Sequence, residues 1–323
     1  MPPVPASDQE GGGPGVDTGT GTGTVAGTVA ILGRPNVGKS TLMNQIVGQK
    51  LAIVSPKPQT TRNRIVGVWN GPAGQIVFVD TPGVHSARGA LNRYMVDQAL
   101  GAIEDVDAAL LVVEPPQSTA AVKIASAERQ ILQILRESRK PVVLAINKVD
   151  TIKDKPALFP ILKAWQELSN FAALVPVSAR KGSGVTGLIK ELCKIVPPGP
   201  PLYAADMLTD RTERFLAAEL IREQLFLSLR QELPYATAVV IDNWEERPDR
   251  KDVVIDASIM VERDSQKSIV LGKGGTMIRD IGTRARAEVS TLLDRPAHLR
   301  LFVKVAPEWT SSSDAIAQLG YER

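Results

Sequence analysis

The chain has 323 residues, of which 43% are hydrophobic and 23% charged, as in an ordinary soluble protein of about two domains. A single cysteine, Cys193, excludes an internal disulfide and fits a reducing cytosol. No apolar run approaches the ~20 residues of a membrane span, and the N-terminus lacks the basic region and apolar core of a signal peptide. We therefore expect a cytoplasmic protein in which any membrane contact is peripheral.

The N-terminal segment, residues 1–26, is rich in Gly, Thr and Pro. It lacks the apolar residues that would offset the entropy of ordering, so we expect a disordered tail. From residue 27 to residue 196, short apolar strand patterns alternate with helical patterns, which predicts an α/β domain with a mostly parallel sheet. The predicted strands are 28–32, 64–69, 75–79, 108–113, 141–146 and 173–177, and the predicted helices are 39–48, 91–102, 126–138, 157–169 and 184–195.

Prolines then interrupt the alternation, and residues 197–210 have the composition of a stiff linker. Residues 211–323 form a second, α+β pattern. Its predicted elements are an amphipathic helix at 211–231 capped by Thr209 or Asp210, strands at 235–242 and 252–263, helices at 266–271 and up to about 293, and a strand at 298–305. The net charge is only +3, but residues 263–304 hold nine Lys or Arg against four acidic residues, a local cluster typical of nucleic-acid binding.

The most informative motif is Gly33-Arg34-Pro35-Asn36-Val37-Gly38-Lys39-Ser40, which follows the first predicted strand and precedes a helical segment from Thr41. This order of strand, Gly-rich loop and helix predicts a phosphate-binding loop. The glycines let backbone N–H groups face phosphate oxygens, and the helix N-terminus adds partial positive charge. Lys39 would reach the β and γ oxygens, and the Ser40 hydroxyl would ligate Mg²⁺.

A second motif, Asp80-Thr81-Pro82-Gly83, ends the strand predicted at 75–79. Asp80 can hold Mg²⁺ through water, and the Gly83 N–H can meet a γ-phosphate. Val84 follows where Ras-like GTPases place a water-orienting glutamine. Hydrolysis is therefore expected to be slow, or to be assisted by another group, a monovalent cation or a partner. His85 is interpreted as an exposed loop residue rather than a base.

Two further motifs predict recognition of guanine. Asn147-Lys148-Val149-Asp150 ends the strand at 141–146, and Ser178-Ala179-Arg180 follows the strand at 173–177. The Asp150 carboxylate can accept from two adjacent ring donors of guanine, which adenine lacks, while Asn147 braces the loop and Lys148 lies along the base. A backbone N–H of the second motif can meet the guanine carbonyl. Four motifs in this order, each at the carboxyl end of a strand, match the place where open α/β sheets bind ligands.

The loop at 55–64 lies between the first helix and the next strand and fits a segment that orders only around a γ-phosphate and Mg²⁺. Together with Asn36 of the phosphate loop, its residues Pro58-Gln59-Thr60-Thr61-Arg62 resemble the Era family of bacterial GTPases. The resemblance covers residues 27–321. By resemblance to related GTPases, Thr61 rather than Thr60 would complete the Mg²⁺ shell, which gives a catalytic set of Asn36, Lys39, Thr61 and Gly83.

The C-terminal part resembles a type II KH domain, with Val261-Glu262-Arg263, Gln266-Lys267, Gly272-Lys273-Gly274-Gly275, Lys304-Val305, Trp309 and Leu319-Gly320-Tyr321 as matching residues. A Gly-x-x-Gly turn between helices lets a single-stranded backbone approach, and an apolar groove beside it receives bases. The alternative is a helix-ending glycine before an ordinary solvated basic helix. Besides the glycines of the turn, the candidate phosphate contacts are Lys273, Arg279, Arg284 and Arg286, and the candidate groove residues are Ile269, Val270, Leu271 and Ile278.

The resemblance implies a GTP-hydrolysing assembly factor for the small ribosomal subunit that binds 16S rRNA near its 3′ end and contacts the inner face of the cell membrane peripherally. It also implies Mg²⁺ as a cofactor, a monomeric protein and, as a hypothesis for Asn36, a bound K⁺ that supports hydrolysis. Two other hypotheses stay open: a signalling GTPase whose KH-like domain binds protein, and an RNA-binding module that senses guanine nucleotides with incidental turnover.

Overall fold

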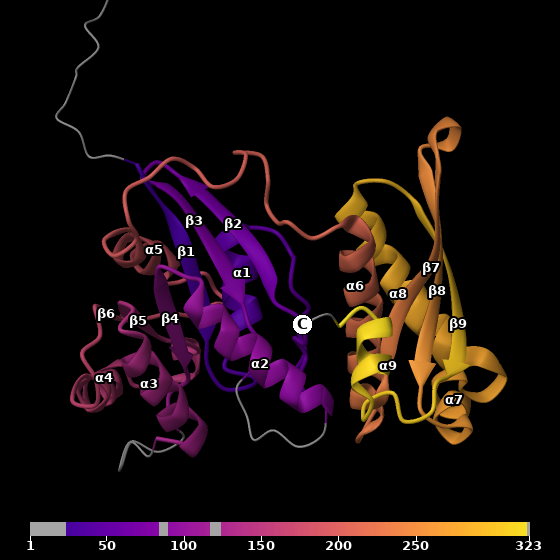
Figure 1. Ribbon diagram of the computed structural model, residues 1–323, viewed down its shortest axis with the longest axis horizontal. Helices are drawn as coiled ribbons and strands as arrows, with labels where there is room; N and C mark the ends of the chain where they lie inside the picture. The colour runs from indigo at the N-terminus through magenta and orange to yellow at the C-terminus, as the bar shows by residue number, and fades with distance from the viewer. Residues whose placement is uncertain (1–23, 84–89, 117–123, 322–323) are drawn as a thin grey trace, which may run out of the picture.

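The computed structural model describes residues 24–83, 90–116 and 124–321, so Val84, His85 and most of the predicted tail lie outside the described residues. The chain folds into two units that lie side by side (Figure 1). The first contains a six-stranded sheet of order β2-β3-β1-β4-β5-β6 in which every neighbouring pair is parallel except β2–β3. Its strands are β1 (Val25–Leu32), β2 (Ile65–Gly71), β3 (Gly74–Asp80), β4 (Ala108–Val113), β5 (Val142–Ile146) and β6 (Ala173–Pro176).

Helices cover both faces of this sheet, which explains why β4 and β5 are buried and apolar along their whole length. One core packs α1 (Lys39–Val47) and α5 (Val185–Cys193) against the sheet, and the other packs α2 (Ala90–Glu104), α3 (Ser126–Ser138) and α4 (Leu158–Gln166). The mostly parallel α/β fold is therefore confirmed. The carboxyl ends of the parallel strands β1, β3, β5 and β6 bring the four motifs to one edge of the sheet.

The second unit is a three-stranded sheet of order β7-β8-β9 with helices packed on it. β7 and β8 are antiparallel, whereas β8 and β9 are parallel. Its elements are α6 (Glu213–Ser228), β7 (Ala238–Arg247), β8 (Asp252–Val261), α7 (Asp264–Leu271), α8 (Thr276–Leu293), β9 (Ala297–Val305) and α9 (Ser313–Gln318). Short 3-10 turns occur at Val149–Thr151, Lys155–Ala157, Leu233–Ala236, Pro248–Arg250 and Lys273–Gly275.

Several element boundaries differ from the sequence predictions; β7, for example, runs from Ala238 to Arg247 rather than over 235–242. β1 begins at Val25, inside the predicted tail, because Val25 pairs with Gly74 of β3. The cap of α6 is Thr212 rather than Thr209 or Asp210, since the Thr212 hydroxyl accepts from the Phe215 N–H at 3.3 Å. Helix α9 was not predicted, and its six residues are too few to give a clear helical period.

The linker predicted at 197–210 lies along the edge of the first unit. The Gln75 amide, which is 1% exposed, accepts from the N–H groups of Leu202 and Tyr203 and donates to the Tyr203 carbonyl. Farther along, Val68 of the edge strand β2 donates its N–H to the Leu208 carbonyl at 2.8 Å. The linker therefore satisfies backbone groups of β2 that an edge strand would otherwise expose.

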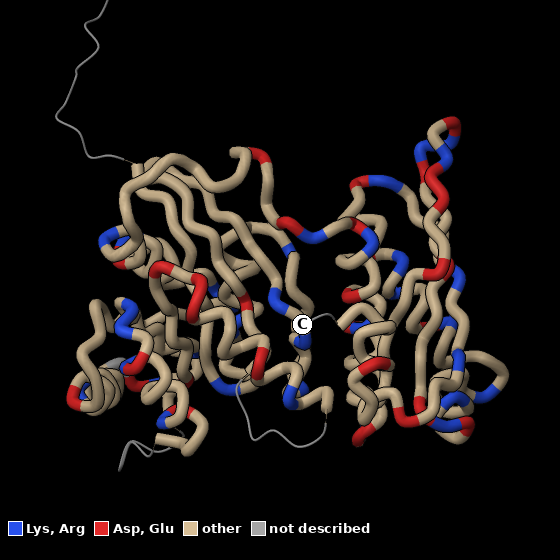
Figure 2. Tube along the Cα trace, viewed as in Figure 1, with Lys and Arg blue, Asp and Glu red and all other residues tan. Residues whose placement is uncertain are grey.

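The two units meet where the loop at 50–64 and helix α2 face α6 and the C-terminal segment. One apolar cluster combines Tyr94 and Met95 of α2 with Trp309, Ile316 and Tyr321 of the second unit. Positive charges of the loop face acidic residues of α6 across this border (Figure 2), and Lys50 lies 2.6 Å from Glu223. Within the described residues, no helix has the length and apolar character needed to cross a membrane.

Candidate functional site

The phosphate loop takes a shape that only glycine permits at two positions. Gly33 has φ of 150°, and a Cβ there would lie 2.3 Å from the Val112 carbonyl oxygen. Gly38 has φ of 94°, and a Cβ there would lie 2.3 Å from the Asn147 side chain. Both glycines therefore keep the loop tight against neighbouring strands. Helix α1 begins at Lys39, so its N-terminus points its partial positive charge toward the loop.

Lys39 is buried within this loop, and its side chain lines the cavity beside it. Its Nζ donates to the carbonyls of Gly33 and Arg34, each at 3.1 Å. Burial lowers the pKa of Lys39 to about 8, and the nearby Asp80 carboxylate partly opposes that shift. A phosphate at the loop would favour the charged ammonium in the same way as Asp80 does.

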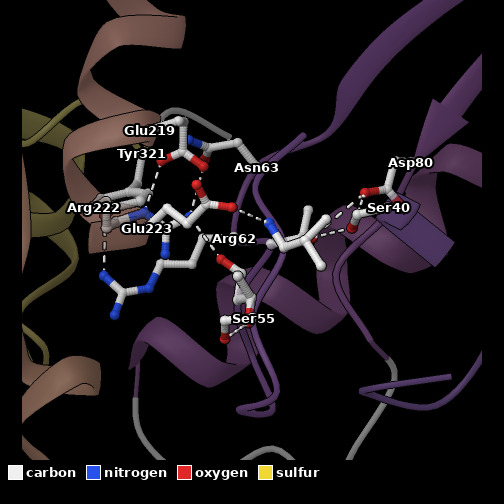
Figure 3. Close-up of polar contacts among 12 residues, drawn as sticks. Ser40, Ser55, Arg62, Asn63, Asp80, Glu219, Arg222, Glu223 and Tyr321 are labelled. Carbon is white, nitrogen blue, oxygen red and sulfur yellow. Dashed lines mark hydrogen bonds and ion pairs between the residues drawn. The ribbon is translucent and has the colours of Figure 1, made fainter. Parts of the chain in front are cut away.

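Three oxygen-bearing side chains meet beside the loop and form a candidate Mg²⁺ site (Figure 3). Ser40 Oγ lies 2.8 Å from Thr61 Oγ1 and donates to Asp80 Oδ2 at 2.6 Å. The other carboxylate oxygen, Asp80 Oδ1, is buried and has no hydrogen-bond partner among the described residues. Burial raises the pKa of Asp80 to about 6, and the nearby Lys39 ammonium partly opposes that shift. Hydroxyl and carboxylate oxygens suit Mg²⁺, so these residues fit the ion.

This geometry distinguishes the two neighbouring threonines. Thr61 lies at the candidate metal site, whereas the Thr60 hydroxyl donates to the Lys57 carbonyl at 2.8 Å. Among the described residues, no group of three or more His, Cys, Asp or Glu side chains gathers in a way that could hold a metal.

The predicted guanine-binding motifs lie together at the other end of the site. Asn147 joins them to the phosphate loop, since its side chain donates to the Val37 carbonyl at 2.8 Å and accepts from the Ala179 N–H at 2.9 Å. Asp150 accepts from the Ser178 hydroxyl at 2.6 Å, and this bond holds the pKa of Asp150 below its usual value. The carboxylate is thus ionised and positioned as an acceptor. The Ala179 N–H donates to Asn147, and the use of a backbone N–H of the motif Ser178-Ala179-Arg180 for guanine stays a prediction.

A cavity of about 700 Å³ connects the two ends and is large enough for a nucleotide. Several predicted residues line it directly: Pro35, Asn36, Gly38, Lys39, Ser40, Thr41, Thr61, Gly83, Asn147, Lys148, Asp150, Ala179 and Arg180. Val37, Asp80, Thr81 and Ser178 are buried and support it from behind. Arg34 instead points away, because its Nε lies 2.8 Å from Glu128. Lys148 pairs with Glu114 at 2.6 Å at the rim.

The second unit holds a separate hollow beside the Gly-x-x-Gly turn. Gly272, Gly274 and Gly275 all have positive φ, between 60° and 76°, so the turn depends on glycine. The hollow has a volume of about 410 Å³ and runs between α8 and β9. Its lining residues are Gly275, Ile278, Arg279, Gly282, Thr283, Arg286, Leu299 and Leu301. An apolar floor with arginines at its rim suits a single strand of RNA.

Not all predicted RNA-binding residues reach this groove. Arg284 lies on another face of α8, where its guanidinium donates to Ser228 of α6 at 2.7 Å. Val270 is fully buried in the core of the second unit, so it does not line a surface either. Ile269 is 57% exposed and remains available. Positions 284 and 286 of one helix are about 200° apart, so the two arginines face different sides of α8.

Arg62 and Arg222 join the site to the second unit, and no sequence motif assigned either of them a role. Arg62 is 1% exposed and makes its hydrogen bonds with residues from 234 to 321, and Arg222 of α6 donates to the Thr60 carbonyl at 2.6 Å. The only signal was the position of Arg62 beside Thr61. Long-range partners of this kind leave no local pattern in the chain.

Comparison with known proteins agrees with both halves of this arrangement. Residues 28–148 match the family described as 50S ribosome-binding GTPase, and residues 232–310 match the KH domain family. GTPase Era of Geobacter metallireducens is 48% identical over 296 residues, covering 92% of this chain and 97% of the relative. GTPase Era of Lactobacillus helveticus is 45% identical over 298 residues, covering 92% of this chain and 96% of the relative.

Two solved structures are similar over nearly the whole chain. A crystal structure of a variant of Aquifex aeolicus Era bound to GDP.AlF4⁻ superposes with a TM-score of 0.88 at 36% identity, covering 93% of this chain and 100% of that one. A crystal structure of Era in complex with MgGDPNP and nucleotides 1506–1542 of 16S ribosomal RNA gives a TM-score of 0.87 at 37% identity, with the same coverage.

Proposed function

Because the chain belongs to the Era family of GTPases, we propose that it binds and hydrolyses GTP, binds 16S rRNA near its 3′ end and assists maturation of the small (30S) ribosomal subunit. The observation that carries this proposal is the presence, in one chain, of a nucleotide cavity with a guanine-selecting carboxylate and a basic Gly-x-x-Gly groove. The resemblance extends the proposal to a monomeric, cytoplasmic protein that contacts the inner face of the cell membrane peripherally.

Each group of residues in the cavity has a distinct role in GTP binding and hydrolysis. Lys39 and the N–H groups of the phosphate loop bind and orient the β and γ phosphates, and the Gly83 N–H meets the γ-phosphate. Mg²⁺ held by Ser40, Thr61 and, through water, Asp80 would neutralise charge on those phosphates. Asp150 selects guanine. These groups supply positioning and electrostatic stabilisation, which are the main contributions of a protein to phosphoryl transfer.

Asn36 is proposed as a ligand of K⁺, which would assist hydrolysis. Its side chain lies 2.8 Å from the Pro56 carbonyl, and both residues line the nucleotide cavity. An amide oxygen and loop carbonyls are the ligands that K⁺ prefers. The cation would add positive charge near the transferring phosphate, which is the kind of stabilisation that the valine at position 84 does not supply.

Hydrolysis in potassium chloride is expected to be about tenfold faster than in sodium chloride at equal ionic strength. In the Asn36→Ala variant this difference should disappear, while GDP affinity stays within about twofold of the unchanged protein, since the phosphate loop is held by other residues. Phosphate release under saturating GTP measures the rates. Equal rates of the unchanged protein in the two salts would remove the cation from the proposal.

The ribosomal part of the proposal is tested by crosslinking the purified protein to total cellular RNA in the presence of Mg²⁺ and GDPNP, followed by sequencing of the footprint. We expect reads concentrated at the 3′ end of 16S rRNA and a footprint that maps to the groove between α8 and β9. Reads scattered over messenger RNA would favour the RNA-binding module with incidental turnover. An absence of RNA together with a captured protein would favour the signalling GTPase.

A further inference from the structure

The loop segment 60–63 lies between the nucleotide site and the second unit, with contacts on both sides. The Thr61 hydroxyl lies 2.8 Å from Ser40 Oγ and within 3.4 Å of Asp80. The next residue, Arg62, extends its side chain into the second unit (Figure 3). The side chains of these two neighbouring residues therefore face opposite sides of the segment. Any displacement of Arg62 is therefore passed to the neighbouring Thr61 hydroxyl.

The second unit encloses the Arg62 guanidinium almost completely. Nη1 donates to the Thr237 carbonyl at 2.8 Å and to Tyr321 Oη at 3.1 Å, and Nη2 donates to the Tyr235 carbonyl at 2.8 Å. The rings of Phe226, Trp309 and Tyr321 surround it, with Cζ 5.7 to 5.8 Å from their centroids. Carbonyl oxygens and aromatic faces stabilise a buried guanidinium without a direct ion pair.

Two further groups of contacts with the second unit hold this segment and the loop just before it. The Thr60 carbonyl accepts from Arg222, which is itself held by a bidentate ion pair with Glu219. The Lys57 ammonium donates to the carbonyls of Phe226 and Leu229 at the end of α6. Within the first unit, the segment is held through Thr61 and through Asn63, whose side chain accepts from the Tyr94 hydroxyl of α2 at 2.7 Å. The docked second unit thus fixes the backbone that carries the Thr61 hydroxyl.

We propose that Arg62 is a positioning residue for the magnesium site: its insertion into the second unit holds Thr61 where the triphosphate form needs it. This inference rests on the proposed GTP switch. Segment 60–63 stays beside the magnesium site as long as the Arg62 guanidinium keeps its contacts with the backbone carbonyls and aromatic rings of the second unit. Because coupling between two events is reciprocal, binding of Mg²⁺ and a triphosphate in turn strengthens docking of the second unit.

The test compares affinities for two nucleotides in the Arg62→Gln variant. Thr61 is needed only when a γ-phosphate and Mg²⁺ are bound, so affinity for Mg²⁺ with GDPNP should fall by about 5- to 150-fold. Affinity for GDP should stay within about twofold. A role of Arg62 in general stability would lower both affinities together. Displacement of a fluorescent GDP analogue measures both constants in the full chain.

The matched control is Arg64→Gln, two residues along the same segment. The Arg64 side chain donates to the Gln98 carbonyl inside the first unit at 2.8 Å, so its loss should leave the ratio of GDPNP to GDP affinity unchanged. A milder variant, Tyr321→Phe, removes one oxygen that accepts from Arg62 and should lower the ratio about two- to fivefold. If Arg62→Gln does not fold, the ratio of GDPNP to GDP affinity in Tyr321→Phe still tests the role of Arg62.

The outcomes separate this inference from the proposed function. An unchanged ratio in folded Arg62→Gln or in Tyr321→Phe, with normal binding of both nucleotides by the unchanged protein, overturns the role of Arg62 alone. Equal losses for GDPNP and GDP overturn it as well. Failure of the unchanged protein to bind either guanine nucleotide overturns the proposed function itself.

Discussion

The Asp150→Asn variant is expected to bind GTP between about 10²- and 10⁴-fold more weakly and to prefer xanthosine triphosphate. The carboxylate accepts two hydrogen bonds from guanine, and bonds to a charged acceptor contribute about 1.5–3 kcal/mol each. Asparagine replaces one of those acceptors with a donor, which faces the guanine donors unfavourably. Xanthine carries a carbonyl where guanine carries an amino group, so the new donor finds an acceptor there.

Direct titration of the unchanged protein and the variant with GTP and with xanthosine triphosphate measures this change of preference. Asp150 lies in the nucleotide cavity and is ionised, because the Ser178 hydroxyl lowers its pKa. Asp154→Asn is the matched control: it removes an exposed carboxylate four residues farther along and should change neither affinity. An unchanged preference for guanine in Asp150→Asn would contradict the assignment of Asp150.

The double variant Lys273→Asp with Gly274→Asp is expected to weaken binding of a single-stranded RNA from the 16S 3′ end by at least 100-fold, with GTP affinity unchanged. Two negative charges would face the RNA backbone at the turn where it approaches most closely. A Cβ at Gly274 meets nothing within 4 Å, so the change creates no clash, and the strain from its φ of 60° is smaller for aspartate than for most residues.

Two single variants on α8 sharpen this test. Arg286 lines the groove, whereas Arg284 donates to Ser228 on another face, so Arg286→Asp should weaken RNA binding far more than Arg284→Asp. Fluorescence anisotropy at several salt concentrations measures the affinities, and loss of a phosphate contact should reduce the slope of the salt dependence by about one. Parallel losses of GTP and RNA binding in the double variant would contradict two separate sites.

The sequence predicted those parts of the molecule that local chemistry determines. The phosphate loop needs glycines at 33 and 38 because the backbone there has positive φ and close neighbours, and such needs are visible in a short motif. Strands β4 and β5 were found because both of their faces are buried. The KH-like unit was found through its Gly-x-x-Gly turn, whose conformation also requires glycine.

Features that depend on distant partners were not predictable in the same way. Arg62 and Tyr321 are 259 residues apart in the chain, and neither position has a local pattern that implies the other. The face on which Arg284 lies depends on the rotation of α8 against α6, which composition does not determine. The cap of α6 also differed, because Thr209, Asp210 and Thr212 are all good capping residues and only the packing selects among them.

The attachment of the linker to β2 limits how far the two units can separate. Leu208 is the last linker residue that bonds to β2, and α6 is capped at Thr212, so a tether of about four residues joins them. A flexible tether of that length spans only ~11 Å on average. It keeps α6 at an effective concentration of millimolar or more beside the loop at 50–64. The contacts around Arg62 therefore need to supply little free energy to stay formed, and modest changes at the nucleotide are enough to shift them.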